Sequence, residues 1–324
     1  MHTPRFEGVV DAARQIAPAA VRTPLIEHPA LNAAVGGRVL LKAETLQVAG
    51  AFKFRGAYNR ISRLSADEKT RGVVAYSSGN HAQGVAAAAQ AVGTPALIVM
   101  PSDSPAVKVD GVRAFGGEVR FYDRWSESRE AIGAQIAAER GSVLVPPFDD
   151  PFVIEGQGTV GLEMLEQAGI EMDQLLCGAS GGGLIAGINL VMAEQSPATR
   201  VIVVEPEAFD DTRRSLEAGI RVGHPDGAPS ICDALMSPLP GELTFPINRR
   251  LAGAATVTDA EVAEAMRFAF RWLKLVIEPG GAVSLAALLS GKVEAKDLTT
   301  GIVLSGGNVD PGLFSEIIEG RFEG

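Results

Sequence analysis

Residues 175–187 read Leu-Leu-Cys-Gly-Ala-Ser-Gly-Gly-Gly-Leu-Ile-Ala-Gly, and this stretch decides the expected fold. Its first three residues form a short apolar run that is typical of a buried strand, and Leu184 to Glu194 is typical of a helix. Between the two, the glycines expose backbone N–H groups at the start of a helix, which suits an anion such as phosphate. The stretch therefore predicts a strand, a phosphate-sized turn and a helix, as in parallel α/β sheets.

The same alternation of strand and helix extends along the chain on both sides of this stretch. Strands alternating with helices predict parallel sheets that are covered on both faces. The prolines and aspartates at 146–151 indicate a crossing between two lobes, and 219–246 is too rich in proline, including Pro225 and Pro246, for regular elements. We expect strands at 39–43, 72–76, 96–100, 118–122, 200–204 and 300–304, and helices at 52–64, 82–91, 106–115, 126–140, 259–275 and 282–289.

Composition excludes several classes of protein. The chain has 324 residues with 29 basic and 39 acidic side chains, and a net charge of −10 disfavours general nucleic-acid binding. Its two cysteines and four histidines form neither a disulfide framework nor a zinc motif, which fits a cytoplasmic protein. Residues 175–193 carry no charge, but the glycines in their middle argue against a membrane-spanning helix.

The glycine-rich turn has two other interpretations. Gly181, Gly183 and Ala186 satisfy the dinucleotide pattern G-x-G-x-x-A, and Glu205 ends the next strand about 20 residues later. A nicotinamide-dependent oxidoreductase is therefore a competing prediction. The glycines could also serve only the close packing of a helix on a strand.

Three further segments contain residues that could react with a ligand or bind one. Lys53 lies between Phe52 and Phe54, where desolvation would lower the pKa of its amine and favour a nucleophile, although a surface lysine is the simpler interpretation. Residues 77–84, Ser-Ser-Gly-Asn-His-Ala-Gln-Gly, precede an alanine-rich helix and suit a carboxylate, or merely cap the helix. Residues 304–308, Leu-Ser-Gly-Gly-Asn, follow a strand end, where open α/β sheets bind ligands.

In this order, the four segments resemble the pyridoxal-phosphate enzymes of the tryptophan-synthase-β fold, specifically the serine/threonine dehydratase and serine racemase family. The resemblance runs from Arg22-Thr23-Pro24-Leu25 to Ser305–Asp310. It implies an α/β fold of two three-layer lobes with parallel-rich sheets, the smaller lobe inserted in the larger. We expect a large cofactor-binding domain of residues 1–68 and 150–324 and a small mobile domain of residues 69–149.

The resemblance also implies the residues that bind pyridoxal 5'-phosphate. Lys53 would form the Schiff base with the cofactor and then act as base toward the substrate, and Ser305 would face the ring nitrogen. Relatives usually have glycine where this chain has Ser180. The full cofactor-binding set is Phe52, Lys53, Asn80, Ser180, Gly181, Gly182, Gly183, Leu184, Glu278 and Ser305.

Substrate and metal residues follow in the same way. The resemblance assigns the substrate carboxylate to Ser77, Ser78, Asn80, His81 and Arg129, and makes Ser78 a second acid–base candidate opposite Lys53. Ala51 and the run Cys232-Asp233-Ala234 depart from the usual Ser and Ala-Asp-Gly, so substrate preference does not carry over. The oxygen ligands Glu205, Phe209 (its carbonyl) and Asp211 resemble a Mg²⁺ or Ca²⁺ site, with solvated carboxylates as the alternative.

The resemblance implies an ammonia-lyase that converts L-threonine or L-serine to a 2-oxo acid and ammonia. Serine racemase and 3-hydroxyaspartate dehydratase are alternatives within the family, and a nicotinamide oxidoreductase or a non-catalytic ligand-binding relative are alternatives outside it. We expect a cytoplasmic homodimer with a small β-hydroxy amino acid as substrate, and neither nucleic acid nor membrane as partner.

Overall fold

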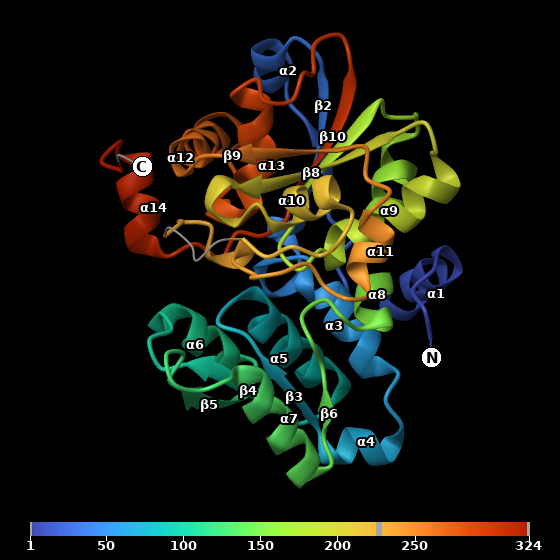
Figure 1. Cartoon of the computed structure of the whole chain (residues 1–324), viewed down its shortest axis with the longest axis vertical. Helices are drawn as coiled ribbons and strands as arrows, with labels where there is room; N and C mark the ends of the chain where they lie inside the picture. Colours follow the sequence, from blue (N-terminus) through green and yellow to red (C-terminus); the bar gives the residue numbers. More distant parts are fainter. Residues whose placement is uncertain (1, 225–228, 323–324) are drawn as a thin grey trace.

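A computed structural model describes residues 2–224 and 229–322 of the chain, and places their strands in two separate sheets (Figure 1). The larger sheet has six strands, and its only antiparallel pair is β1 with β2 at one edge. In spatial order its strands are β1 (Leu25–Glu27), β2 (Arg38–Ala43), β10 (Thr299–Leu304), β7 (Gln174–Gly178), β8 (Arg200–Pro206) and β9 (Gly253–Val257).

The smaller sheet is wholly parallel and is built from the middle of the sequence. Its strands, in spatial order, are β5 (Glu118–Tyr122), β4 (Ala96–Pro101), β3 (Val73–Tyr76) and β6 (Val143–Leu144). The helices α4 (Ala66–Arg71), α5 (Asn80–Val92), α6 (Ala106–Ala114) and α7 (Arg129–Arg140) accompany it. We call this unit the small lobe; in Figure 1 it is the lower part of the molecule.

The large lobe surrounds the six-stranded sheet and occupies the upper part of Figure 1. Its interior contains apolar side chains from the sheet and from α13, among them Leu176, Ile302 and Leu285. Its helices are α1 (Phe6–Ile16), α2 (Pro29–Val35), α3 (Lys53–Ser62), α8 (Pro151–Ala168), α9 (Gly183–Gln195), α10 (Asp211–Ala218), α11 (Thr244–Asn248), α12 (Asp259–Phe268), α13 (Pro279–Leu289) and α14 (Pro311–Ile318).

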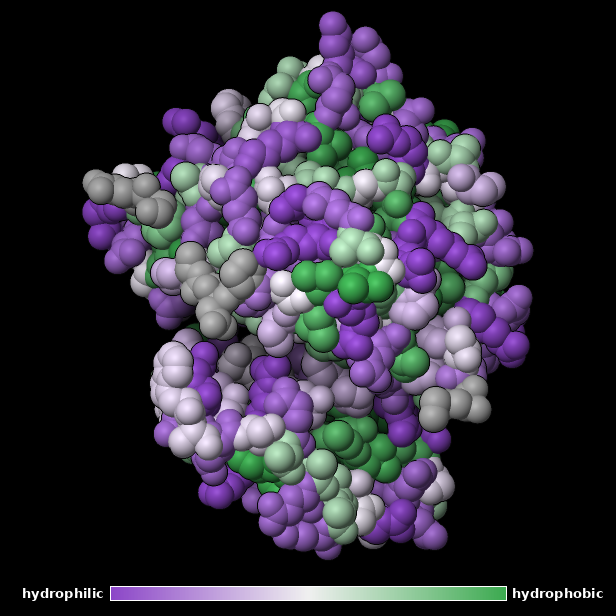
Figure 2. Space-filling view, viewed as in Figure 1, coloured by the Kyte–Doolittle hydropathy of each residue, from purple (hydrophilic) through white to green (hydrophobic). Residues whose placement is uncertain are grey.

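Helices α3 and α8 lie where the two lobes meet. Figure 2 shows a largely hydrophilic face that is notched at this level. Helix α3 packs against both α5 of the small lobe and α8, so its first residue stands between the two sheets. None of the helices in the described ranges is long and apolar enough to cross a membrane.

The fold class expected from the sequence is confirmed: two α/β lobes with parallel-rich sheets, the smaller made from an inserted segment. All six expected strands are present. The expected crossing at 146–151 is partly wrong, because Pro151 already begins the 18-residue helix α8. Asp150 caps that helix by accepting a hydrogen bond from Val153 N at 3.0 Å, the usual arrangement for Asp-Pro at a helix start.

Other boundaries also differ from expectation, among them the start of α13 at Pro279, three residues earlier than predicted. Helix α5 begins at Asn80, two residues earlier than predicted, and α7 begins at Arg129, three residues later. The helix predicted to reach residue 275 ends at Phe268, where a π-helical turn follows up to Leu273. The proline-rich region 219–246 does contain regular turns, including the start of α11 with Pro246 in its first turn; Pro225 lies outside the described residues.

Candidate active site

A cavity of about 460 Å³ lies between the lobes and receives side chains from both. Strand β3 and helices α5, α6 and α7 of the small lobe contribute to one wall. The large lobe contributes the start of α3, the turn before α9 and the ends of β7 and β10. Of the predicted site residues, it gathers Phe52, Lys53, Ser77, Ser78, Asn80, His81, Arg129, Ser180, Gly181, Gly182, Gly183, Leu184, Glu278 and Ser305.

Lys53 is the first residue of α3 and places its amine in this cavity. Its Nζ donates a hydrogen bond to the carbonyl of Pro147 at 2.8 Å and lies 5.0 Å from the centre of the Phe52 ring. Neither neighbour carries a negative charge, so burial lowers the pKa of Lys53 to about 7. About half of an amine with this pKa is neutral at pH 7 and therefore available as a nucleophile.

The glycine-rich turn lies at the start of α9. Gly182 has φ +87°, and a Cβ there would lie 2.5 Å from Asn248 Nδ2, so only glycine fits without strain. The carbonyl of Gly181 accepts a hydrogen bond from Thr244 Oγ1 at 2.6 Å, and that of Gly182 accepts one from Asn248 Nδ2 at 3.2 Å. With the carbonyls held in this way, the turn can offer its N–H groups and the helix N-terminus to a phosphate.

Ser180 is the residue of the turn at which relatives usually have glycine, and its hydroxyl makes a contact within the protein. Its Oγ accepts a hydrogen bond from the backbone N–H of Ser237 at 3.1 Å. The side chain thus fastens the turn to the loop around residue 237, while the residue still lines the cavity.

The turn after β3 brings Ser77, Ser78 and the N-terminus of α5 to the cavity. Ser77 Oγ accepts a hydrogen bond from Gly79 N at 3.1 Å, which fixes the turn. His81 is buried, with Nε2 2.8 Å from the carbonyl oxygen of Val145, and burial lowers the pKa of its ring to about 3. Its imidazole is therefore neutral, so any contribution of His81 to binding a carboxylate does not come from a positive charge.

Asn80 joins the small lobe to the large one. Its Nδ2 donates to Glu278 Oε1, and its Oδ1 accepts from Asn308 Nδ2 at 2.8 Å. Burial first, and then Asp233, raise the pKa of Glu278 to about 7. The contact of Asn308 with Asn80 was not predicted from the sequence, although Asn308 belongs to the segment 304–308.

The small-lobe wall of the cavity is cationic. Arg129 lies 5.6 Å from the centre of the Tyr76 ring and pairs with Glu130 at 2.8 Å. Arg124 and Lys108 also line the cavity, and Lys108 pairs with Asp233 of the opposite lobe. Neither Lys108 nor Arg124 was predicted from the sequence, because neither lies in a motif.

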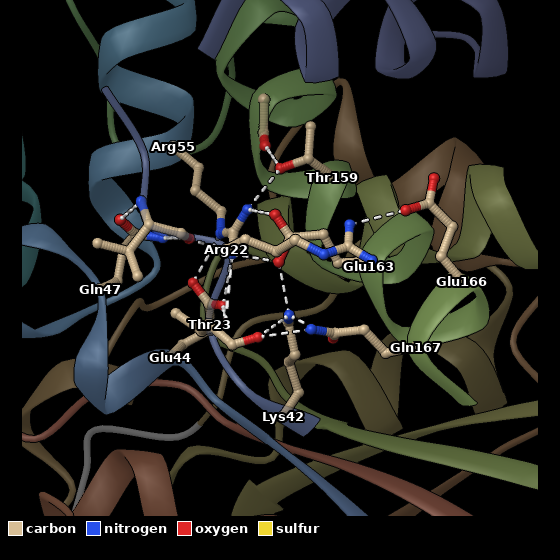
Figure 3. A network of polar contacts seen from close by, with 12 residues as sticks. Arg22, Thr23, Lys42, Glu44, Gln47, Arg55, Thr159, Glu163, Glu166 and Gln167 are labelled. Atoms are coloured by element: carbon tan, nitrogen blue, oxygen red, sulfur yellow. Dashed lines mark hydrogen bonds and ion pairs between the residues drawn. The ribbon is translucent and has the colours of Figure 1, made fainter. Parts of the chain in front are cut away.

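Behind Lys53, a buried network holds helix α3 in place (Figure 3). The Arg55 guanidinium, fully buried, contacts Glu44 at 2.8 Å and Glu163 at 2.6 Å. Lys42 is equally buried and also pairs with Glu163, and Thr23 donates to Glu44 at 2.6 Å. This network connects α3 to α8 and β2, and so fixes the direction in which the helix presents Lys53.

The predicted metal ligands lie outside the cavity, at the end of β8 and the start of α10. Glu205 accepts hydrogen bonds from the backbone N–H groups of Thr212 at 2.9 Å and Arg213 at 2.8 Å. Both carboxylate oxygens of Asp211 are buried without a hydrogen-bond partner in the described part of the chain. Burial first, and then Glu205, raise the pKa of Asp211 to about 8.

This acidic pair is short of side-chain ligands. No group of three or more His, Cys, Asp or Glu side chains among residues 2–224 and 229–322 is arranged to hold a metal. A cation here would therefore need backbone oxygens such as the Phe209 carbonyl, together with water, which hard cations accept.

The fold and the cavity together define a class of enzyme. A desolvated lysine amine, a phosphate-sized helix N-terminus and a serine at a strand end fit a phosphorylated aldehyde cofactor that is bound through lysine. The chain matches the family described as pyridoxal-phosphate dependent enzyme over residues 16–306 and belongs to it. Pyridoxal 5'-phosphate is therefore its cofactor, and the nicotinamide alternative is wrong.

Similar proteins have related chemistries. The chain is 42% identical to an L-threo-3-hydroxyaspartate ammonia-lyase of Pseudomonas sp, over 99% of this chain and 100% of that protein. The structure of maize serine racemase has a TM-score of 0.93 and 37% identity, covering 99% of this chain and 98% of that one. The structure of a T.th. threonine deaminase has a TM-score of 0.88 and 44% identity, covering 95% of this chain and 99% of that one.

Proposed function

We propose that this chain is a pyridoxal-phosphate-dependent ammonia-lyase that converts L-threonine or L-serine to the 2-oxo acid and ammonia. The observation that carries the proposal is the cavity between the lobes, where the Lys53 amine and the N-terminus of α5 line the same space. The Lys53 amine can act as a base at the reacting carbon of an amino acid, and the N-terminus of α5 can bind the carboxylate of the same amino acid.

The residues of the cavity have separate roles in this reaction. When bound, the cofactor withdraws electrons from the substrate's Cα. Lys53 would remove the Cα proton and return a proton to the β-hydroxyl, which leaves as water. The released aminoacrylate becomes an imine, and water hydrolyses this imine to the 2-oxo acid and ammonia. Ser305 would hold the cofactor ring with a neutral hydroxyl, which favours elimination over a long-lived carbanion, and Asn80 would help to hold the same ring.

The substrate carboxylate is held by three groups on the small lobe: the turn at Ser77 and Ser78, the α5 N-terminus at Asn80 and His81, and Arg129. Residues 69–149 move as one domain against residues 1–68 and 150–324, so that closure excludes water from the cavity.

Serine racemisation is a second reaction that the cavity allows. Ser78 lines the same space as Lys53 and could deliver a proton to the other face of the substrate. We expect slow racemisation beside dominant elimination, because an unactivated serine is a weak acid. Ser78→Ala should abolish D-serine formation and keep part of the elimination; equal D-serine from both proteins would refute this role.

3-Hydroxyaspartate is a second candidate substrate. Arg124 and Arg129 line the small-lobe wall and could receive a second carboxylate, and the Pseudomonas relative is named for this substrate. Both guanidinium groups already have an acidic partner, Asp103 and Glu130 respectively. We therefore rank the monocarboxylic substrates first.

A substrate panel tests the proposal. The purified protein, with its cofactor band confirmed by absorbance, is assayed for ammonia and 2-oxo acid with L-serine, L-threonine, both 3-hydroxyaspartate diastereomers and phenylserine. Higher kcat/KM for L-serine or L-threonine supports the first candidate, and higher kcat/KM for L-threo-3-hydroxyaspartate replaces it with the second. No ammonia from any of them would end the lyase proposal.

We also propose that Glu205, the Phe209 carbonyl and Asp211 bind Mg²⁺ or Ca²⁺. The two carboxylate oxygens of Asp211 support this, because they have no hydrogen-bond partner among residues 2–224 and 229–322, and buried carboxylates are ordinarily paired or bound to metal.

A further inference from the structure

Lys108 is a buried cation that the reaction described above does not use. It lies on α6 of the small lobe, and its side chain is only 7% exposed. A lysine this buried is rare unless it is paired. Its partner, Asp233, lies in the short turn Asp233–Leu235 of the large lobe, and both residues line the cavity.

The two side chains of the Lys108–Asp233 pair differ in their exposure to water. The side chain of Asp233 is 48% exposed, so its carboxylate keeps contact with water. The ammonium of Lys108 has three N–H donors, and its bond to Asp233 uses one of them. No second acceptor for Lys108 occurs in the described ranges, so the ammonium has capacity for another anion.

The position of that anion follows from Gly79. A Cβ on Gly79 would lie 3.9 Å from Lys108 Nζ, with no other atom that close, so the ammonium lies beside the turn that precedes α5. The first N–H groups of α5 have no acceptor within the helix, and they make its N-terminus electropositive. Lys108 and the helix N-terminus therefore favour negative charge at the same place, and a carboxylate there would interact with both.

We infer that Lys108 is a substrate-binding residue that pairs with the α-carboxylate of the amino acid at the Ser77–His81 turn. This inference rests on the proposed function and adds a residue to it. In this arrangement the substrate carboxylate and Asp233 share the ammonium of Lys108. Because Asp233 belongs to the large lobe and Lys108 to the small one, the carboxylate is bound where the two lobes meet. Substitution of the cation and substitution of its protein partner should therefore have different effects.

The test compares wild type with Lys108→Met, Lys108→Arg and Asp233→Asn as holoenzymes. Loss of one charge-assisted contact should raise KM for L-serine about 10- to 100-fold in Lys108→Met, with a much smaller change in kcat. Lys108→Arg should stay within about 5-fold of wild type because it keeps the charge. Asp233→Asn should keep or lower KM, because the ammonium then serves the substrate alone.

Arg113→Met is the matched control, since Arg113 is exposed on the same helix and lies 3.9 Å from Asp110. A binding readout accompanies the kinetics: the change in the cofactor's absorbance on titration with L-serine, and with ethanolamine, which lacks the carboxylate. Lys108→Met should weaken the response to L-serine and leave the midpoint for ethanolamine unchanged.

Two outcomes would overturn the inference. If Lys108→Met and Asp233→Asn raise KM equally and lower the melting temperature equally, the pair is only a tie between the lobes. If Lys108→Met binds L-serine as wild type does, the ammonium does not contact the carboxylate. Wild type that turns over no amino acid but binds L-serine through Lys108 would refute the proposed lyase and retain this site.

Discussion

Lys53 and Arg55 are two residues apart on one helix, and their surroundings are opposite. Burial by itself would lower the pKa of Arg55, but Glu44 and Glu163 reverse this and raise it above its ordinary value. Lys53 has a carbonyl and a phenyl ring as neighbours, and burial lowers its pKa to about 7. One side of α3 thus carries a fully paired cation and the other an uncompensated one.

The difference between Lys53 and Arg55 distinguishes a buried group with a structural role from one with a chemical role. A buried charge with partners on every side is stable and inert, whereas an uncompensated buried group keeps a reactive protonation state. Asp211 resembles Lys53 in this respect, because its oxygens are buried and unpartnered within the described residues. Uncompensated groups therefore mark the positions where this protein is expected to bind something.

Lys53→Ala should have the largest effect. It removes the base and the group that holds the cofactor, so turnover should fall by at least about 10³-fold and the cofactor's absorbance band should be lost. Urea unfolding of the cofactor-free proteins should show no loss of stability, since the variant removes a desolvated amine. A variant that keeps the band and the activity would contradict the assignment.

Arg55→Met tests the paired side of α3. Glu44 would lose its cation, and breaking a buried pair from one side costs about 3–5 kcal/mol of unfolding free energy. Urea unfolding of the wild-type and variant holoenzymes measures this loss. Arg38→Met is the control, because Arg38 pairs with Glu27 at 2.9 Å on the exposed surface and its replacement should cost much less stability. Equal losses of unfolding free energy in the two variants would show that burial of the Arg55 pair adds nothing to its contribution.

The pH dependence of modification sharpens the comparison for Lys53. In the cofactor-free protein, about half of Lys53 is neutral at pH 7, whereas an ordinary lysine reaches that point near pH 10.4. Acetic anhydride should therefore acetylate Lys53 faster than the exposed lysines at pH 7, with a rate that levels off as pH rises above 7. Peptide mass spectrometry from pH 6 to 9 measures both rates, and a rate that climbs in parallel with the others would contradict the low pKa.

Removal of divalent cations should have the smallest effect. If Asp211 and Glu205 bind Mg²⁺ or Ca²⁺, a chelator should lower the melting temperature by roughly 3–5 °C, and the added ion should restore it. Asp211→Asn should abolish this response. Without a bound cation, the wild type should not respond to the chelator. Asp211→Asn should then change the melting temperature little at pH 7, because a carboxyl group with a pKa of about 8 is already mostly uncharged there.

Local patterns in the sequence predicted the strands other than β1, β6 and β9, and the glycine-rich turn, because each depends on neighbouring residues. The role of Lys53 was predicted from the family resemblance, since its local pattern alone also fits a surface lysine. Helix α8 was missed because Gly156, Gly158 and Gly161 obscure its pattern. Those glycines let helices approach closely: a Cβ on Gly158 would lie 2.8 Å from the Gly187 carbonyl oxygen. The pairs Arg55–Glu163 and Lys108–Asp233 join residues more than 100 positions apart, which no local pattern registers.

The position of β10 has a consequence for synthesis of the protein. This strand, the last in the sequence, lies between β2 and β7 and pairs with both. During translation, the two halves of the large sheet stay unjoined until residues 299–304 have left the ribosome, whereas every strand of the small lobe precedes residue 145. The small lobe can therefore fold first, and a nascent chain that stops before β10 would expose unpaired strand edges to chaperones or aggregation.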